Sequence, residues 1–220
     1  MEEIRQAFVR VGTAVIADIF DSLGRVPPVL TTDLFPVPSS GVTFVGPAYT
    51  VTGESKRWPG GGDRAKLAAI DAMPPGVVPV WAGADIRGVC CFGDLLAEAM
   101  KARGCAGVVV DGGVRDLLYL ESLGLPLMVR YRTPAQAIGR WRVTGSQVPV
   151  RVRGALEDWV TVEPGDLVVA DRDGVIVVPA TVVATVAPRA LRWADKDSRA
   201  REDIRNGGSL LKALDTYGHL

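Results

Sequence analysis

Cysteine and histidine are scarce in this sequence, and their scarcity argues against several kinds of site. The three cysteines, Cys90, Cys91 and Cys105, include no Cys-x-x-Cys pair that would hold zinc. Because their number is odd and two are adjacent, we expect buried thiols in a reducing cytoplasm rather than a disulfide framework. The single histidine, His219, lies next to the C-terminus, which argues against a catalytic Cys–His pair.

The sequence also lacks an excess of one charge. Lys and Arg together number 25, and so do Asp and Glu, which gives a formal net charge of zero. Nucleic-acid-binding proteins are typically basic, so we expect no nucleic-acid partner, and near neutrality leaves self-association unopposed. No run approaches the ~18 apolar residues of a membrane span, and the polar first five residues do not resemble a signal peptide.

Nucleotide-binding motifs are missing as well. The triplet Gly60-Gly61-Gly62 is not followed by the Lys-Ser/Thr of a P-loop, and no Gly-x-Gly-x-x-Gly motif follows a strand in the required way. The charged segment 189–205 carries both signs, which is typical of a solvated helix face rather than an RNA site.

The hydrophobic pattern predicts one α/β domain that spans residues 1–220. We expect helices at 1–24, 65–72, 93–103, 115–123 and 181–206, with a short tail at 207–220 that is helical in part. We expect strands at 46–52, 77–81, 107–111, 127–131, 141–143, 148–153, 160–162, 167–170 and 174–179. The segments 25–40 and 53–64 are predicted to be loops, and 53–64 is either passive surface or a lid.

Two turns carry the residues that chemistry would use. The first, 93–96 (Gly-Asp-Leu-Leu), begins a predicted helix, whose free N–H groups and dipole favour a carboxylate or phosphate. On this turn alone, a capping role for Asp94 is the favoured interpretation. The second, 110–116, runs from a buried strand through two glycines to Arg115 and Asp116 at a helix start. Arg suits a carboxylate and Asp suits Mg²⁺ or Mn²⁺, so here we favour a functional site over an N-cap with a salt bridge.

These residues resemble the RraA-like family, which includes the class II 4-hydroxy-4-methyl-2-oxoglutarate aldolases that also decarboxylate oxaloacetate. The resemblance lies in 93–96 and in 104–116 (Gly-Cys-Ala-Gly-Val-Val-Val-Asp-Gly-Gly-Val-Arg-Asp). It extends to the segments 13–24, 44–51 and 162–179, and so covers most of the chain. An older label for the family is dimethylmenaquinone methyltransferase, but no glycine-rich S-adenosylmethionine loop follows the first strand.

The resemblance implies a swivelling β/β/α-type single domain with a central mixed sheet and flanking helices. It also implies a homotrimer or homohexamer with sites between subunits. In these sites Gly93, Asp94, Leu95 and Leu96 bind the pyruvyl carboxylate, chiefly through the N–H groups of the two leucines. Arg115 binds substrate and stabilises an enolate, Asp116 ligates Mg²⁺ or Mn²⁺, and Asp94 helps in proton transfer.

The family also supplies an acidic residue from the C-terminal helix of a neighbouring chain. Counting back from Gly207 places Asp197 there, where the family usually has Glu, and Glu202 is the rival candidate. A second departure is the triplet 90–92 (Cys-Cys-Phe), where the resemblance leads us to expect bulkier apolar residues.

Three functions follow from the resemblance. The first is a metal-dependent lyase that cleaves a 2-oxo acid to give pyruvate. The five lysines (Lys56, Lys66, Lys101, Lys196 and Lys212) lie in predicted loops or charged helices away from the Arg–Asp turn, so we expect no Schiff base. The second is a non-enzymatic ring that inhibits an RNA-degrading enzyme. The third is a related enzyme whose substrate differs because of the 53–64 loop and the paired cysteines.

Overall fold

A computed structural model describes residues 2–39, 41–59, 61–83 and 86–218. Its strands are β1 (Phe35–Val37), β2 (Phe44–Ser55), β3 (Val78–Ala82), β4 (Cys90–Phe92), β5 (Val108–Val114), β6 (Leu127–Arg132), β7 (Trp141–Ser146), β8 (Val150–Arg153), β9 (Trp159–Val162), β10 (Leu167–Asp171) and β11 (Gly174–Val178). Its helices are α1 (Glu2–Val11), α2 (Thr13–Ser22), α3 (Arg64–Asp71), α4 (Asp94–Ala102), α5 (Leu117–Leu123), α6 (Val183–Arg205) and α7 (Leu210–Tyr217). None of these helices is both long and apolar enough to cross a membrane.

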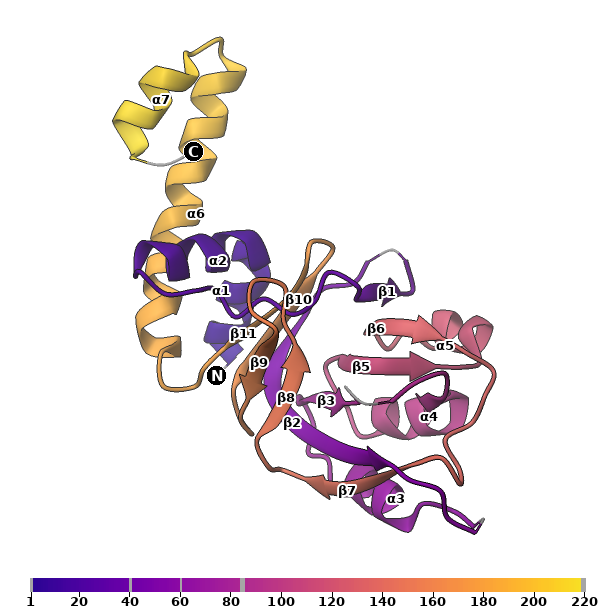
Figure 1. Cartoon of the computed structure of the whole chain (residues 1–220). Coiled ribbons are helices and arrows are strands. Elements are labelled where there is room, and N and C mark those ends of the chain that lie inside the picture. Colours follow the sequence, from indigo (N-terminus) through magenta and orange to yellow (C-terminus); the bar gives the residue numbers. More distant parts are fainter. Residues whose placement is uncertain (1, 40, 60, 84–85, 219–220) are drawn as a thin grey trace.

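A mixed sheet in the order β1-β6-β5-β3-β2-β10-β11 forms the centre of the molecule, with β4 paired to β5 and β7 paired to β2 (Figure 1). The strands β2, β3, β5 and β6 run parallel to their neighbours in this part of the sheet, and helices connect them. The strands β10 and β11 add an antiparallel edge, and β8 pairs with β9 in a separate hairpin. The predicted α/β fold with a central mixed sheet and flanking helices is confirmed.

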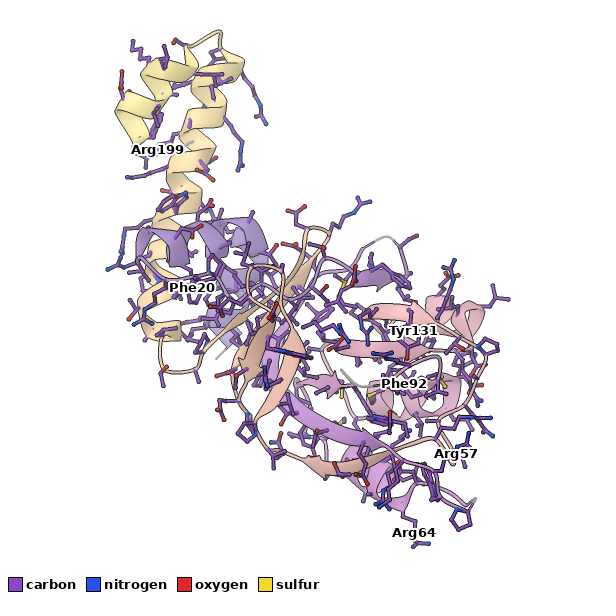
Figure 2. All side chains as sticks on the ribbon, viewed as in Figure 1. Phe20, Arg57, Arg64, Phe92, Tyr131 and Arg199 are labelled. Carbon is purple, nitrogen blue, oxygen red and sulfur yellow. The ribbon has the colours of Figure 1, made fainter. Side chains whose placement is uncertain are left out.

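The two faces of the sheet bury different partners because side chains alternate along each strand. Val108 and Val110 of β5 pack with α3, α4 and α5 in one core, which also holds Trp81. Val109 points the other way and packs with β8 and β9 in a second core. A third core joins α1, α2 and the first turns of α6 to β10 and β11, with Phe20 between α2 and α6 (Figure 2).

The C-terminal helices form an arm. The distal half of α6 projects from the body, and α7 folds back against it (Figure 1). Three leucines of α7 are exposed: Leu210, Leu211 and Leu214. In Figure 1 the arm lies away from α3, α4 and α5, the helices that cover the first core.

Several predicted boundaries are wrong for identifiable reasons. The single helix expected at 1–24 is broken at Gly12, whose φ of 81° ends α1. The carboxylate of Asp171 then caps α2 by accepting hydrogen bonds from the N–H and Oγ1 of Thr13, both at 2.7 Å. The strand β2 continues to Ser55, so the loop expected at 53–64 is shorter, and β4 was not predicted. The segment 25–40 contains β1.

Candidate active site

The two predicted turns meet because their strands are neighbours. β4 pairs in parallel with β5, with Cys90 opposite Gly113 and Phe92 opposite Val114. The chain beyond each strand therefore emerges at the same edge of the sheet, where ligand sites of α/β folds tend to lie. The backbone N–H of Arg115 donates to the carbonyl of Phe92 at 3.2 Å, which ties the second turn to the first.

Gly93 lies where these two turns touch. A Cβ at this position would collide with Oδ2 of Asp116 and would lie 2.8 Å from Cγ of Arg115. Its φ of −136° is accessible to any residue, so glycine is required here for space and not for backbone conformation. The absence of a side chain at position 93 lets Arg115 and Asp116 lie directly against the start of α4.

Asp116 holds this junction together. Its Oδ2 accepts hydrogen bonds from the backbone N–H of Asp94 and from Nε of Arg115, both at 3.2 Å. It has a φ of 62° in the left-handed region, which costs a non-glycine residue on the order of 1 kcal/mol or more and which clusters at functional sites. The helix expected to begin at Arg115 begins at Leu117 instead, because Asp116 cannot continue a right-handed helix in this conformation.

The paired glycines allow the close approach that glycine permits, but not through unusual dihedral angles. Gly112 and Gly113 belong to β5 and have no positive φ, so they do not form the expected turn. A Cβ on Gly113 would collide with the ring of Tyr131, and one on Gly112 would lie 2.8 Å from Sγ of Cys91. Both glycines therefore let neighbouring strands pack closely beneath the site.

A cavity of about 280 Å³ opens at this junction. Its walls include Gly93 to Leu96, Arg115, the three residues of β4, and Gln136, Ala137 and Ile138. Arg115 also borders a second hollow that is lined by Asp116. The substrate-binding residues expected from the sequence thus share one cavity, while the expected metal ligand lies beside it.

The N-terminus of α4 is partly engaged. The N–H of Leu95 donates to Oδ1 of Asp94 at 2.7 Å, and that of Asp94 donates to Asp116. Within the described part of the chain, the N–H of Leu96 has no recorded acceptor. Of the two N–H groups that were expected to hold a carboxylate, the one on Leu96 is therefore available, whereas the one on Leu95 requires the Asp94 side chain to move.

The two cysteines of the cavity are not nucleophiles. Burial raises the pKa of the Cys90 thiol and raises that of Cys91 to about 12. Both thiols are therefore protonated near pH 7, and a protonated thiol is a poor nucleophile. Cys90 and Cys91 shape the cavity wall, as the scarcity of histidine suggested.

The expectation that no lysine lies near the Arg–Asp turn is wrong for Lys66. It lines the same cavity as Arg115, although only 6% of its surface is exposed. Its Nζ donates to the carbonyl of Cys91 at 2.7 Å and lies 5.0 Å from the centre of the Trp141 ring. Burial lowers the pKa of this amine below 10.5, and Cys91, Asp63 and Cys90 partly oppose that shift. This burial is not evident from the sequence, because Lys66 lies on a helix of only eight residues, too short for a clear apolar face.

Asp197 does not join this cavity within one chain. It lies in the distal half of α6, where its carboxylate pairs with Arg201 at 3.5 Å. Glu202, the rival candidate, lies on the same arm. A contribution from the arm of a neighbouring chain stays a prediction. His219 lies outside the described residues.

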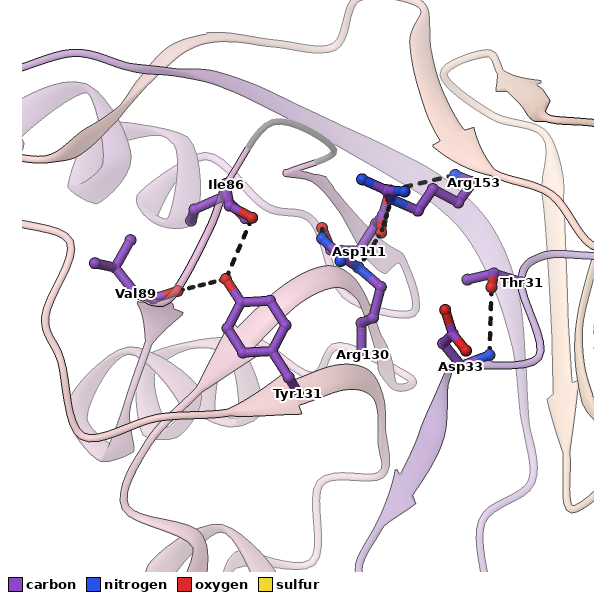
Figure 3. Close-up of polar contacts among 8 residues, drawn as sticks. All are labelled: Thr31, Asp33, Ile86, Val89, Asp111, Arg130, Tyr131 and Arg153. Atoms are coloured by element: carbon purple, nitrogen blue, oxygen red, sulfur yellow. Dashed lines mark hydrogen bonds and ion pairs between the residues drawn. The ribbon is translucent and has the colours of Figure 1, made fainter.

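A buried ion pair lies on the opposite face of the sheet (Figure 3). Asp111 is fully buried, and its Oδ1 lies 2.6 Å from Nε of Arg130 and 3.8 Å from Nε of Arg153. Its Oδ2 accepts the backbone N–H of Arg153 at 3.2 Å, which ties β5 to β8. Nearby, the hydroxyl of Tyr131 donates to the carbonyl of Val89 at 2.9 Å and so fixes the segment that precedes β4.

Comparisons with known proteins agree on the family. The family model described as "RraA-like: Aldolase/RraA" matches residues 13–177. A protein of Halalkalibacterium halodurans named "Putative 4-hydroxy-4-methyl-2-oxoglutarate aldolase" is 33% identical over 198 residues, which cover 88% of this chain and 85% of that protein.

Two solved structures have similar folds. Streptomyces coelicolor RraAS2, an unusual member of the RNase ES inhibitor RraA protein family, superposes with a TM-score of 0.78 and 28% identity, covering 90% of this chain and 96% of that chain. A protein from Pseudomonas syringae pv. tomato superposes with a TM-score of 0.82 and 29% identity, covering 97% of both chains.

Proposed function

The chain belongs to the RraA-like family, and from this premise we propose that it is a divalent-metal-dependent lyase. It cleaves a carbon–carbon bond of a 2-oxo acid to give pyruvate, as in 4-hydroxy-4-methyl-2-oxoglutarate aldolysis and oxaloacetate decarboxylation. The observation that carries this proposal is the meeting of Arg115, Asp116 and the start of α4 around Gly93. A guanidinium and a helix N-terminus together suit the 2-oxo carboxylate of such a substrate.

The carboxylates beside the cavity fit a magnesium or manganese ion. Within the described residues, no group of three or more His, Cys, Asp or Glu side chains could hold a metal ion by itself. Asp94 and Asp116 are adjacent, however, and Mg²⁺ is commonly bound by one or two carboxylates with water and substrate completing its shell. Asp116 would hold the ion, and a bound divalent cation would supply Lewis-acid stabilisation of negative charge at the substrate oxygens.

Arg115 has the main catalytic role. Cleavage beside a 2-oxo group leaves the enolate of pyruvate, whose negative charge develops in the transition state. The Arg115 side chain, held by Asp116 at 3.2 Å, is positioned before that charge appears. Such a preorganised donor is commonly worth about 3 kcal/mol at the transition state, or about a hundredfold in rate. The N–H of Leu96 holds the carboxylate of the same substrate half.

Asp94 is the candidate for proton transfer. Its carboxylate accepts the N–H of Leu95 and lines the cavity at the first turn of α4. From this position it can take a proton from a substrate hydroxyl group and return one to the enolate carbon. Within the described residues this carboxylate accepts a backbone N–H and makes no ion pair, so it can turn toward a ligand.

We also propose that the complete site lies between chains of a homotrimer or homohexamer. The arm formed by α6 and α7 supplies Asp197, or Glu202, to the cavity of a neighbour. Light scattering of the purified protein measures the assembly. An active monomer would remove this part of the proposal.

The test of the lyase proposal is pyruvate release from oxaloacetate and from 4-hydroxy-4-methyl-2-oxoglutarate, with Mg²⁺, Mn²⁺ or EDTA. The rate without protein is subtracted because metal ions decarboxylate oxaloacetate unaided. Asp116→Asn removes the charge but keeps the size and tolerates a positive φ, so loss of turnover would reflect the carboxylate. Asp71→Asn, an exposed acid on α3, is the matched control. Release that persists in EDTA would contradict the metal requirement.

A second function has support from one comparison. The similarity to RraAS2 favours a ring that binds and inhibits an RNA-degrading enzyme. This alternative needs neither Arg115 nor a metal. Inhibition of a purified RNase E-type enzyme by both wild type and Asp116→Asn, without pyruvate release by wild type, would favour it.

A further inference from the structure

We propose that Lys66 is a specificity residue that binds a second carboxylate of the substrate. The inference rests on the lyase function proposed above and assigns the residue that recognises the departing half of the substrate. In 4-hydroxy-4-methyl-2-oxoglutarate that half carries a carboxylate. Arg115 and the start of α4 would bind the 2-oxo acid end, and Lys66 would bind the far end.

The first observation is a buried charge without a balancing carboxylate. Among the described residues, none places a carboxylate in an ion pair with Nζ of Lys66. Asp63 is the nearest acid on the same element, but its Oδ1 accepts the backbone N–H of Lys66 and its Oδ2 accepts that of Val143. Burial of an ammonium without an anionic partner costs free energy. A ligand carboxylate would supply the missing negative charge.

The second observation is unused hydrogen-bonding capacity at the cavity wall. An ammonium group has three N–H donors, and the carbonyl of Cys91 accepts one of them. The ring of Trp141 covers one side of the ammonium. Lys66 also lines the cavity, so its remaining donors are placed to meet a bound ligand.

The third observation is the separation of the two cations across β4. Successive carbonyls of a strand face opposite edges. The carbonyl of Phe92 accepts the backbone N–H of Arg115 on the edge that pairs with β5, while the carbonyl of Cys91 accepts Nζ of Lys66 on the other edge. Burial raises the pKa of the Cys90 thiol, and the charges of Arg115 and Lys66 both oppose that shift. Arg115 and Lys66 therefore approach the cavity from opposite edges of β4, and both line it.

This arrangement matches a dicarboxylate better than a monocarboxylate. A substrate with one carboxylate would pair with Arg115 and leave the Lys66 ammonium at the cavity wall without an anionic partner. A second carboxylate on the departing half would pair with Lys66 and would favour its charged form. Aldol cleavage suits this arrangement, because the second carboxylate leaves intact, whereas in oxaloacetate decarboxylation that carboxylate is the group that is lost.

The experiment compares two substrates that differ at one end. Both 4-hydroxy-2-oxoglutarate and 4-hydroxy-2-oxopentanoate give pyruvate on aldol cleavage, but the first ends in a carboxylate and the second in a methyl group. Wild type should have the higher kcat/KM for the carboxylate substrate. Lys66→Met should lower the ratio of the two kcat/KM values by about 10- to 100-fold, the usual range for a hydrogen bond to a charged group. The change should appear mainly in KM for the carboxylate substrate.

Matched variants separate a direct role from a structural one. Lys66→Gln is neutral but can still donate to the Cys91 carbonyl, so it should lose the same preference if charge is what matters. Lys101→Met is the control, since Lys101 also donates to a backbone carbonyl, that of Leu123, but does not line the cavity. An equal fall with both substrates, or no change with either, would overturn the role of Lys66.

A binding measurement keeps this inference separate from the lyase proposal. Calorimetric titration with Mg²⁺ present compares 2-oxoglutarate with 2-oxopentanoate, which lack the 4-hydroxyl and are not cleaved by aldolysis. Wild type should bind 2-oxoglutarate about tenfold more tightly, and Lys66→Met should bind both equally. If wild type releases no pyruvate but shows this binding difference, the lyase proposal fails and the role of Lys66 stands. If wild type binds 2-oxoglutarate and 2-oxopentanoate equally, the role of Lys66 is overturned, while the lyase proposal is unaffected.

Discussion

Two basic side chains, the buried Lys66 and the largely buried Arg130, lie on opposite faces of the same sheet, and they differ in which groups surround their charges. Arg130 lies 2.6 Å from the fully buried carboxylate of Asp111, whose second oxygen accepts a backbone N–H of β8. Lys66 has a backbone carbonyl and an aromatic ring around its ammonium, and it lines a cavity. The first arrangement is complete within the chain and joins two elements. The second arrangement is completed by a ligand, which is why we assign structure to Arg130 and function to Lys66.

The largest effect on stability should come from breaking the ion pair between Asp111 and Arg130. Asp111→Asn leaves the Arg130 charge buried without its partner, so the free energy of unfolding should fall by about 3 kcal/mol, the lower part of the range for such changes. The lower part applies because Arg130 keeps 16% of its side chain exposed. Urea denaturation measures the change. The control Asp71→Asn breaks an exposed pair with Arg103 and should change stability by less than about 1 kcal/mol.

If Asp111→Asn lowers the free energy of unfolding by less than about 1 kcal/mol, Arg130 tolerates the absence of a carboxylate partner as Lys66 does. The contrast between the two cations would then fail. The double variant Asp111→Asn, Arg130→Met removes the guanidinium that Asp111→Asn leaves unpaired, while Asn keeps an acceptor for the backbone N–H of Arg153. It should recover most of the lost stability if the cost arises from the unpaired guanidinium of Arg130.

The next effect concerns turnover at the cavity. Gly93→Ala places a methyl group against Oδ2 of Asp116 and within 2.8 Å of the Arg115 side chain. Displacement of catalytic groups by about 1 Å can cost about a hundredfold in rate, so pyruvate release should fall by that amount. Thermal unfolding should change little, because the φ of Gly93 suits alanine and the displaced side chains are partly exposed. Normal turnover would show that Arg115 and Asp116 need not lie against α4.

The smallest effect should be a gain in stability when the unbalanced charge is removed. Lys66→Met should raise the free energy of unfolding near pH 7 by about 0.5–2 kcal/mol, as is common when a functional residue is replaced by a better-packed one. Denaturation of both proteins without ligand measures the difference. A clear loss of stability would show that Lys66 is structural, like Arg130.

The same variant should show a defined pH dependence. Burial lowers the pKa of Lys66 in the folded state from its ordinary value of 10.5, against the opposing influence of Cys91, Asp63 and Cys90. Between the lowered pKa and 10.5 the unfolded chain binds more protons, so wild-type stability from this group rises with pH. The advantage of Lys66→Met should therefore be largest below the lowered pKa and should shrink as the pH approaches 10.5. An advantage that does not change with pH would exclude the charge as its cause.

Sequence patterns predicted the parts of the molecule that local order determines. A continuous valine run predicts β5, and turn signals such as 163–166 delimit β10. The sequence also indicates 93–96 and Arg115–Asp116 as chemistry-bearing turns, and the pairing of β4 with β5 brings them together. The strand β4 was missed because three residues, two of them cysteine, give too short a pattern. The helix start at Leu117 was missed because the left-handed conformation of Asp116 depends on its contacts with Asp94 and Arg115.

The two buried cations could not be predicted in the same way. The partner of Arg130 is 19 residues away in another strand, so the pair exists only after the sheet forms. Lys66 is buried by Trp141 of β7, which is still more distant in the chain. Lys66 is expected away from the Arg–Asp turn, and Arg130 carries no motif in the sequence, so only the three-dimensional packing shows what surrounds each cation.

The most direct test of the proposed function is the turnover number of Arg115→Lys for pyruvate release from 4-hydroxy-4-methyl-2-oxoglutarate with Mg²⁺. Lysine keeps the positive charge but lacks the planar fork that faces Asp116 and the substrate. The lyase proposal predicts a fall in kcat of about a hundredfold or more, with thermal unfolding unchanged. A kcat within a few-fold of wild type would contradict the assignment of Arg115 as the group that stabilises the enolate.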